Sequence, residues 1–543
     1  MAKDTEAAEA PAKTVTERLD EVFAPWNRTD EPGLVVGVMK DGALIYRRAF
    51  GMASLEHGAA NTPATRMRIG SISKHFTCLL ALLLAEDAKL DLDQPIRTYI
   101  PELTGPGGEP TLRQLMQHRG GSRCYLDLSF VGHGMAVPPV GHALALQQRQ
   151  KSRNFAPGEA MIYNNGGYHL VSIAIERVGG APFEAQLKAR LFDVVGMPDT
   201  VSLPSDHDIT PGVAAMHIPS RGAWRRGLFP SEEVRGEGAI VSTVDDMLRW
   251  TAHLRSRDRL GSSRTWAELT ELPRYADGSL GLYALGLMLD EYRGLKTLHH
   301  SGGVMGGTAQ MILFPDQGLD IVILANGAKA GDVVRLAQQV ADIVLADQVG
   351  PETPTIDAEA FKGALGDYWS PETRMVYSLS EEGGVLKLSL CKGQVGVALV
   401  PAADGWMVLP AGGLGEIAVK IEGGDLLVRF GQATDRLQRL ADDEANGEAF
   451  AAAALGRYVS DDADTIAVIE RDGEGLAISQ SDGLGRVRAP LIPLSPTVAY
   501  SKPRGALAQL RNVVSLDVAG GEATGFRLNT ARTRNLEFRR MSR

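Results

Sequence analysis

A serine and a lysine three positions apart give this sequence its strongest chemical signal. Ser71 and Lys74 lie in the segment Ile69-Gly70-Ser71-Ile72-Ser73-Lys74. If a helix begins near Ser71, the two side chains share one helix face and lie within hydrogen-bond reach. A serine hydroxyl is a weak nucleophile until a base takes its proton, and an apolar setting lowers the pKa of a lysine enough for it to help. The pair therefore predicts a nucleophilic serine, although this spacing alone is more often a helix start with an exposed lysine.

Tyr163 and Asn165 form a second candidate element. They follow the segment Phe155-Ala156-Pro157-Gly158 and precede a helical segment that starts near Tyr168. Loops held by a rigid scaffold commonly carry functional side chains, which favours a role for Tyr163. The alternative is a buried tyrosine whose hydroxyl is satisfied inside the protein.

The segment His299-His300-Ser301-Gly302-Gly303 is the third element. Neighbouring residues of a strand point to opposite faces, so only one of the two histidines can face a given site. The glycines would let a substrate lie against the strand, with the Gly303 amide as a hydrogen-bond donor. The alternative is a hairpin edge with exposed histidines.

The elements around these residues predict an antiparallel sheet covered by helices. Phe76 to Glu86 is apolar nearly all round, which predicts a helix buried on every side. The turn Lys40-Asp41-Gly42 predicts an opening hairpin. Hairpin strands at both ends with helices between them indicate an α+β fold rather than βαβ winding. The other expected helices are 111–118, 168–178, 244–254 (preceded by Ser242 as a cap) and 332–346, and the expected strands are 33–38, 44–50, 308–314 and 319–325.

The C-terminal part of the sequence contains an internal repeat. After Pro351 to Pro354 the chain turns to short strand-like runs separated by Gly and Asp. Leu365-Gly366-x-Tyr368 recurs 90 residues later as Leu455-Gly456-x-Tyr458. Two similar all-β modules are the economical interpretation, with chance resemblance of hairpins as the alternative. The predicted organisation is a disordered tail over 1–14, a catalytic domain over 15–349 and two small antiparallel β-barrel domains over 355–446 and 447–543.

Composition excludes several classes of function. A chain of 543 residues with 44% apolar residues is too long for one small domain and can bury a large core. Its 66 acidic and 56 basic residues give a net charge of −10, which argues against a nucleic acid or an anionic membrane as main partner. Three widely spaced cysteines argue against a disulfide scaffold. No apolar run is as long as a membrane span, and Met1 to Thr14 lacks the apolar stretch of a secretory signal. We expect reduced thiols and a cytoplasmic protein.

Motifs of other chemistries are absent from the sequence. It has no G-x-S-x-G elbow, no H-E-x-x-H or Cys/His ligand cluster, and neither a Walker loop nor a dinucleotide fingerprint. The sequence therefore predicts neither a metal nor a cofactor.

Taken together, Ser71-x-x-Lys74, Tyr163-x-Asn165 and His300-x-Gly302 resemble the motifs of the penicillin-recognising serine hydrolases. This superfamily includes class C β-lactamases, DD-carboxypeptidases, family VIII esterases and D-aminopeptidases, and the resemblance covers roughly residues 14 to 349. It implies a β-lactamase/transpeptidase-like fold. Many members carry Lys-Thr-Gly as the third motif, whose cation engages a substrate carboxylate. The largely neutral imidazole of His300 weakens such capture. His-x-Gly is similar to D-aminopeptidases and many esterases, and only the former also carry two C-terminal β-barrel domains.

The resemblance implies a role for each motif residue. Ser71 would attack the substrate carbonyl, and Lys74 with Tyr163 would act as general base and then as general acid. Asn165 would orient Lys74, and His300 would line the opposite wall and tune Tyr163. The backbone amides of Ser71 and Gly303 would form the oxyanion hole.

The resemblance also implies a substrate-binding loop. In D-aminopeptidases a loop of the last domain narrows the catalytic cleft, and its position in the repeat corresponds to Ser481 to Val487. A plain hairpin loop is the alternative. The predicted substrate-binding residues are Ser301, Gly302, Asp482, Gly483 and Leu484.

The predicted activity is release of small, D-Ala-like N-terminal D-amino acids from peptides and amino-acid amides through an acyl-enzyme. The alternatives are an esterase, β-lactamase or DD-carboxypeptidase with the same chemistry, and a non-hydrolytic protein that binds peptidoglycan fragments. The expected partner is a small peptide or amino-acid amide, without nucleic acid or membrane, and a homodimer is left open.

Overall fold

A six-stranded antiparallel sheet forms the centre of the N-terminal half of the chain. The computed structural model describes residues 13–542 except 221, 328–331, 391, 393, 410–416, 444–445 and 509. In spatial order the strands of the sheet are β10 (Met288–Tyr292), β11 (Leu295–Val304), β12 (Gly307–Phe314), β13 (Leu319–Ala325), β1 (Leu34–Lys40) and β2 (Ala43–Phe50).

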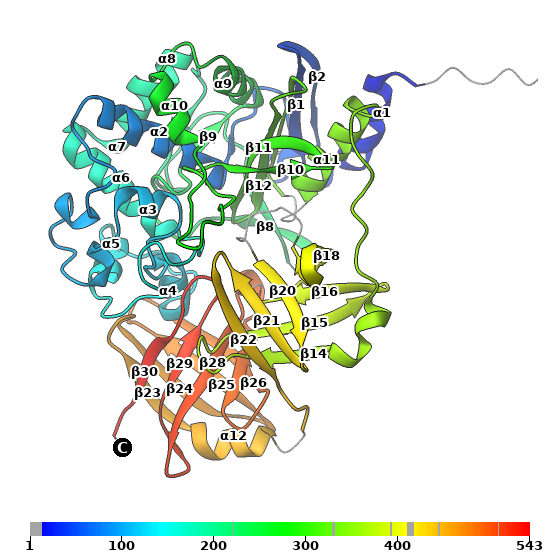
Figure 1. Cartoon of the computed structure of the whole chain (residues 1–543). Coiled ribbons are helices and arrows are strands. Elements are labelled where there is room, and N and C mark those ends of the chain that lie inside the picture. Colours follow the sequence, from blue (N-terminus) through cyan, green and yellow to red (C-terminus); the bar gives the residue numbers. More distant parts are fainter. Residues whose placement is uncertain are drawn as a thin grey trace, which may run out of the picture.

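Helices cover both faces of this sheet (Figure 1). The helices of this half are α1 (Val15–Phe23), α2 (Ser73–Glu86), α3 (Leu112–Met116), α4 (Tyr125–Gly132), α5 (His142–Gln148), α6 (Asn165–Gly179), α7 (Phe183–Leu187), α8 (Asp193–Val195), α9 (Val244–Ser256), α10 (Ser263–Leu269) and α11 (Asp332–Val344). In β1, Val36 and Val38 pack with α1 and α11, whereas Val35 packs with the core around α2 and α9. The period of two along a strand thus supplies one apolar face to each layer of helices.

Short strands complete this half of the chain. They are β3 (Met52–Ser54) with β4 (Ala59–Ala60), β5 (Met67–Arg68) and β6 (Val201–Ser202) on either side of β9 (Ile240–Ser242), and β7 (Met216–Ser220) with β8 (Ala223–Gly227).

The predicted helices are present, with shifted ends. The apolar helix α2 is buried from Ser73 to Leu84, as its sequence predicts. Helix α9 is capped by Thr243, whose side chain accepts the Asp246 amide, and not by Ser242, which is the last residue of β9. Ser242 is buried, and its hydroxyl is 2.8 Å from Thr200 Oγ1.

The disordered tail predicted over 1–14 falls almost entirely outside the described residues and stays a prediction there. Residues 1–12 lie outside the described part of the chain. Thr14, however, caps α1 in a capping box with Glu17. The reciprocal hydrogen bonds of that box order Thr14 together with the helix.

Two antiparallel β assemblies follow in the C-terminal part. The first is a nine-stranded sheet whose edge strands, β17 and β18, are consecutive in the chain, so the sheet is nearly closed. Its strands, in spatial order, are β17 (Val397–Ala398), β16 (Val385–Ser389), β15 (Val376–Glu382), β14 (Gly366–Trp369), β22 (Ala433–Arg439), β21 (Asp425–Phe430), β20 (Ile417–Glu422), β19 (Met407–Val408) and β18 (Val400–Pro401).

The second assembly is a closed barrel. Its first strand β23 pairs with its last strand β30, so it has no free edge. Helix α12 (Asn446–Ala454) precedes strands β23 (Gly456–Ser460), β24 (Thr465–Asp472), β25 (Gly475–Ser481), β26 (Arg486–Pro493), β27 (Val498–Ser501), β28 (Asn512–Ala519), β29 (Glu522–Asn529) and β30 (Leu536–Arg540). The predicted α+β fold with two barrel-like modules is confirmed, whereas the exact domain limits stay a prediction.

A buried tyrosine holds the start of each β assembly. Tyr368 and Tyr458 are both buried, and each hydroxyl donates to the carbonyl oxygen four residues earlier at 2.6 Å. They pair in register with Arg439 and Arg540, respectively. The same contacts at both copies show that the 90-residue similarity is a structural repeat.

Helices α4 and α5 pack onto the closed barrel (Figure 1). Tyr125, Leu128 and Leu146 of these helices belong to one buried cluster with the barrel residues Phe526 and Phe538. The N-terminal half and the barrel therefore share an apolar core, which fixes how they lie against each other.

Arg123 adds a buried polar contact to this junction. Its side chain is 1% exposed and pairs with Asp462 of the barrel at 3.0 Å. It also donates to the backbone carbonyls of Arg534 at 2.9 Å and Asn535 at 3.1 Å. A guanidinium shielded from water needs such partners.

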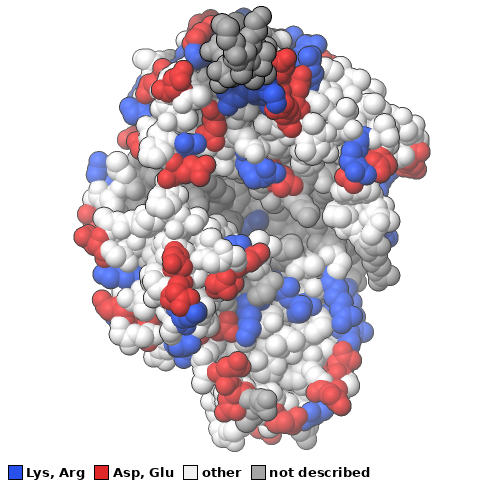
Figure 2. All heavy atoms as spheres, turned by 90° about the vertical axis from the view of Figure 1, so that its right-hand side faces the viewer, with Lys and Arg blue, Asp and Glu red and all other residues white. Residues whose placement is uncertain are grey.

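Charged side chains of both signs are interspersed over the face shown in Figure 2. None of the helices that the structure describes combines the length and the apolar character that a membrane crossing requires. The cytoplasmic location inferred from the sequence stays a prediction.

Replacing Arg123 with methionine should destabilise the junction between the N-terminal half and the barrel. The change leaves the Asp462 carboxylate buried without its cation, which costs about 3–5 kcal/mol in comparable pairs. We expect a lower urea midpoint, measured by circular dichroism. Lys151→Met is the matched control, because Lys151 pairs with Asp461 across the same junction but is 71% exposed. It should leave the midpoint nearly unchanged, and equal effects of the two variants would contradict this account.

Candidate active site

Ser71 and Lys74 meet where a 3₁₀ turn runs into a buried helix. Gly70–Ile72 forms the turn, and α2 begins at Ser73. Lys74 Nζ lies 3.0 Å from Ser71 Oγ. The tight turn brings residues i and i+3 nearly into line, which explains the short contact.

The Lys74 amine is fully buried and has two further partners. Nζ donates to Asn165 Oδ1 at 2.9 Å and to the Glu237 backbone carbonyl at 2.7 Å. Burial lowers the pKa of Lys74 to about 7. The Glu237 carboxylate opposes this shift, and the positive charge of Arg532 adds to it. In a large share of the molecules, Lys74 is therefore neutral near pH 7.

These contacts orient the amine once it is neutral. A neutral Nζ has two N–H donors and one lone pair. The Asn165 oxygen and the Glu237 carbonyl can only accept, so they take the two hydrogens. The lone pair is then left for Ser71, whose hydroxyl can donate to it, and this is the geometry of a general base.

The Tyr163 ring lies beside the same amine. Lys74 Nζ is 4.7 Å from the ring centroid. The Tyr163 hydroxyl is buried and has no hydrogen-bond partner among the described residues. Burial raises the pKa of this phenol far above its ordinary value, and the nearby Ser71 hydroxyl offsets only part of the rise. Tyr163 thus keeps its proton at neutral pH and has an unused donor at the reaction centre.

His300 is a neutral wall of the site. Its ring centroid is 6.2 Å from that of Tyr163. Its Nδ1 lies 2.5 Å from the Ser301 carbonyl oxygen, which can only accept a hydrogen bond, so Nδ1 carries the hydrogen. The other ring nitrogen, Nε2, then accepts from the Tyr283 hydroxyl at 3.0 Å. Burial, reinforced by the Lys74 charge, holds the pKa of His300 well below its usual range. Its neighbour His299 pairs instead with an aspartate of β10.

Glycines let β11 lie directly against the turn that carries Ser71. A Cβ on Gly302 would stand 1.9 Å from the Ile69 carbonyl oxygen and 3.2 Å from the Ser71 amide nitrogen. The Gly303 amide nitrogen lies 2.7 Å from where a Gly70 Cβ would stand. Any larger residue at 302 would push the strand away. The amides of Ser71 and Gly303, the predicted oxyanion hole, therefore lie at one junction between turn and strand.

The predicted substrate loop over 481–487 contacts the end of α4. Asp482 Oδ2 lies 2.5 Å from His133 Nδ1, Gly485 packs on the His133 backbone, and Leu484 is 42% exposed. Gly483 is the open tip of the turn, with φ of 89°. The expectation that Asp482, Gly483 and Leu484 line the cleft stays a prediction. The contacts of this hairpin are with the end of α4, where the Asp482 carboxylate lies against His133.

Another loop of the barrel lies beside Tyr163. The β29–β30 loop carries Arg532, whose guanidinium carbon is 5.8 Å from the Tyr163 ring centroid. Asp127 of α4 holds this loop, because its carboxylate accepts from the Thr530 hydroxyl and, at 3.1 Å, from the Arg532 amide. Burial opposes the charge of Arg532, but the nearby Asp127 carboxylate and Cys124 side chain raise the pKa of its guanidinium. The only sequence signal for it was an arginine-rich hairpin loop.

Glu237 is the other residue that the motifs did not reveal. It directly precedes the segment Gly238 to Thr243, and its side chain is buried. Its carboxylate accepts from the Tyr125 hydroxyl at 2.5 Å, while its carbonyl accepts from Lys74. Glu237 therefore links α4 to the catalytic lysine.

Comparisons with known proteins agree with this architecture. The family model described as Beta-lactamase matches residues 12–345. A D-aminopeptidase of Cereibacter sphaeroides (strain ATCC 17029 / ATH 2.4.9) is 28% identical over 530 residues, covering 94% of this chain and 96% of the relative. A D-aminopeptidase of Brucella suis biovar 1 is 28% identical over 362 residues, or 65% of this chain and 66% of the relative.

Solved structures show the same fold. An octameric penicillin-binding protein homologue from Pyrococcus abyssi matches with a TM-score of 0.55 at 22% identity, covering 78% of this chain and 98% of that one. A D-amino acid amidase from Ochrobactrum anthropi SV3 matches with a TM-score of 0.52 at 23% identity, covering 62% and 98%. The resemblance inferred from the three motifs is thereby confirmed, and the chain belongs to the beta-lactamase family.

Proposed function

We propose that this chain is a serine hydrolase that releases small N-terminal D-amino acids from peptides and amino-acid amides. The observation that carries the proposal is the contact between Ser71 Oγ and a buried Lys74 with a pKa of about 7. Relatives named D-aminopeptidase, matched over nearly the whole chain, support the choice of substrate.

The proposed reaction begins with proton transfer from Ser71 to Lys74. Ser71 Oγ attacks the substrate carbonyl, and the negative oxygen is received by the amides of Ser71 and Gly303, each donor contributing about 2.7–4 kcal/mol. Tyr163 donates its proton to the departing amine, so that an uncharged amine leaves. The phenolate regains a proton from the protonated Lys74. Water then attacks the acyl ester, with Lys74 accepting the water proton. The ester bond breaks, the Ser71 hydroxyl is regenerated, and the free D-amino acid is released.

A substrate panel tests the free-amine requirement. D-Ala-p-nitroanilide, its N-acetylated form and a short-chain p-nitrophenyl ester are compared by kcat/KM. Preference for the free amine supports the aminopeptidase. Indifference to acetylation, with faster ester cleavage, favours an esterase instead.

One observation favours a second candidate, a peptidase that recognises a substrate carboxylate. His300 is neutral, but Arg532 brings a permanent cation to the Tyr163 side of the site, where the leaving group departs. A leaving group with a free carboxylate, as in D-Ala-D-Ala, would meet this guanidinium.

The assembly into homodimers also stays a proposal, which light scattering coupled to size-exclusion chromatography can test.

Ser71→Ala should reduce kcat to the background rate, a loss of about 10⁵- to 10⁶-fold, because the nucleophile is removed. The melting temperature should stay close to that of the wild type, since a single oxygen atom is lost at a partly exposed position. Turnover of D-Ala-p-nitroanilide and circular dichroism check the two expectations. Substantial residual turnover by a folded variant would remove the assignment of Ser71.

The pH profile of kcat/KM should have an acid limb centred near pH 7. Below that pH, Lys74 is protonated and has no lone pair for the Ser71 proton, so the rate falls about tenfold per pH unit. Above it the base is neutral and the rate reaches a plateau. A rate independent of pH between 5 and 8 in the wild type would contradict the role of Lys74.

Arg532→Met should discriminate between the two substrate classes. If the guanidinium binds a leaving-group carboxylate, kcat/KM for N-acetyl-D-Ala-D-Ala should fall at least about tenfold, while D-Ala-p-nitroanilide should be affected little. The acid limb should move to higher pH in either case, because the Arg532 charge lowers the pKa of Lys74. An unchanged acid limb would show that the loop lies elsewhere in solution.

A further inference from the structure

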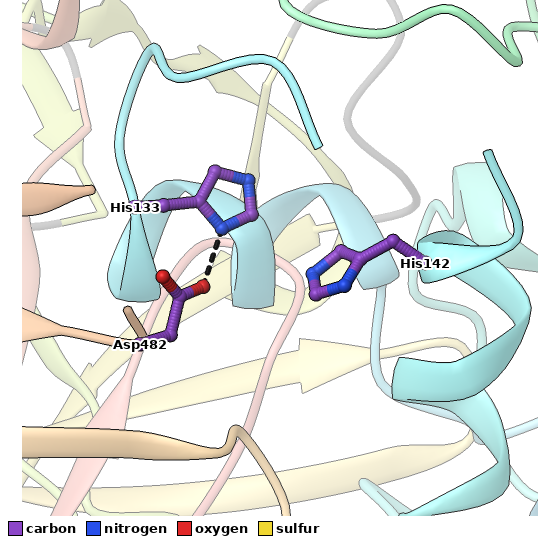
Figure 3. A group of neighbouring side chains, drawn as sticks. All are labelled: His133, His142 and Asp482. Carbon is purple, nitrogen blue, oxygen red and sulfur yellow. Dashed lines mark hydrogen bonds and ion pairs between the residues drawn. The ribbon is translucent and has the colours of Figure 1, made fainter. Parts of the chain in front are cut away.

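We propose that His133, His142 and Asp482 form a binding site for one divalent metal ion of the zinc class. His133 follows the last residue of α4, His142 begins α5, and Asp482 follows β25 of the barrel. Figure 3 shows the three side chains turned toward one another. Each offers one ligand atom, and these atoms lie within 4.8 Å of one another. The sequence predicts no metal because these residues come together only through the packing of the barrel on α4 and α5.

The Asp482 carboxylate is held in place for such a role. Its Oδ1 accepts from the Leu484 amide at 3.0 Å, which leaves Oδ2 facing His133 Nδ1 at 2.5 Å. The side chains of His133 and Asp482 are 1% and 4% exposed. Two of the three groups are thus fixed and withdrawn from bulk water.

His142 supplies a nitrogen with no other use in the structure. Its Nε2 is buried and has no hydrogen-bond partner among the described residues. The ring centroids of His142 and His133 are 5.3 Å apart. Glu233 fixes the start of α5 by accepting the amides of Gly141 and Ala143, both at 2.9 Å. A buried nitrogen without a partner destabilises the fold, and a metal bond would remove that cost.

The site has room for a further ligand. On the side away from Asp482, the two histidines and Ser129 border a cavity of ≈ 10 Å³. This is about the space that one water molecule needs. A water molecule could therefore complete a four-coordinate site.

The ligand set selects the metal. Two imidazoles and one carboxylate suit Zn²⁺, which binds nitrogen and oxygen at about 2.0–2.2 Å in tetrahedral sites. Ligand atoms of such a site lie about 3.3 Å apart. The ion would replace the hydrogen bond between His133 and Asp482, whose ligand atoms would move apart by about 0.8 Å, and His142 would move closer.

The metal would join the two parts of the molecule. The eight residues of α4 span about 12 Å. Asp127 holds the Arg532 loop near the first turn of this helix, and His133 lies at its other end. The site therefore lies at the opposite end of α4 from the Arg532 loop and would act as a clamp between α4, α5 and the barrel.

The test uses untagged full-length protein that has been stripped with a chelator and dialysed. Titration with Co²⁺ should give the visible absorption of tetrahedral cobalt without a thiolate charge-transfer band, and calorimetry with Zn²⁺ should give one ion per chain. Zn²⁺ should raise the melting temperature by several degrees. None of these readouts needs hydrolytic activity, so failure of the metal site and of the proposed function can be told apart.

Two ligand variants and one control complete the experiment. Asp482→Asn and His142→Gln should each weaken Zn²⁺ binding at least tenfold and abolish the thermal shift. His207→Gln is the matched control, because His207 is a half-exposed histidine that pairs with Glu232 at 3.3 Å, and it should bind Zn²⁺ like the wild type. The proposal is overturned if the wild type takes up no stoichiometric metal at micromolar concentration, or if both ligand variants bind as the wild type does. Should one variant fail to fold, the wild-type titration and the other variant still decide.

Discussion

The exclusion of water from one lysine amine is the constraint on which the catalytic half of this protein depends. Lys74 can be neutral near pH 7 only because α2 is buried from Ser73 to Leu84. Burial alone would leave the amine free to rotate. The two oxygen acceptors from Asn165 and Glu237 fix its hydrogens and so decide where its lone pair points. An apolar helix thus sets the basicity of the group, and two distant segments set its direction.

The barrel is part of the same arrangement and not an appendage. Cys124, Tyr125 and Leu128 of the N-terminal half share a core with Phe526 and Phe538. Two polar contacts lie beside this core. Asp127 places the Arg532 loop. Glu237 binds the Tyr125 hydroxyl with its carboxylate and Lys74 with its backbone carbonyl. Because α4 takes part in both contacts, a displacement of the barrel would alter the charge beside Tyr163 and the support of the catalytic lysine together.

The parts of the fold that could be predicted from the sequence are those set by local pattern. Helix α2 and the hairpin of β1 and β2 followed from apolar periodicity and from a turn dipeptide, and the repeat from paired Leu-Gly-x-Tyr segments. The contact of Ser71 with Lys74 followed from their spacing. Residues placed by tertiary packing could not be predicted in this way. Arg532 lies about 370 positions from Tyr163, and no periodicity indicates which of several barrel hairpins, that of Asp482 or that of Arg532, turns toward the cleft.

The choice between these two hairpins follows from charge and from loop anchoring. The turn of the β25–β26 hairpin carries Asp482, whose carboxylate contacts the buried His133 at the end of α4. The β29–β30 loop carries Arg532, and Asp127 in the first turn of the same helix accepts hydrogen bonds from this loop. One helix therefore binds an acidic hairpin at its C-terminal end and a basic one at its N-terminal end. This pairing is the reverse of what the helix dipole favours, so side-chain partners, and not the helix termini, fix the register of the barrel on α4. The cation beside the Tyr163 ring is thus the one carried by the loop whose backbone Asp127 anchors.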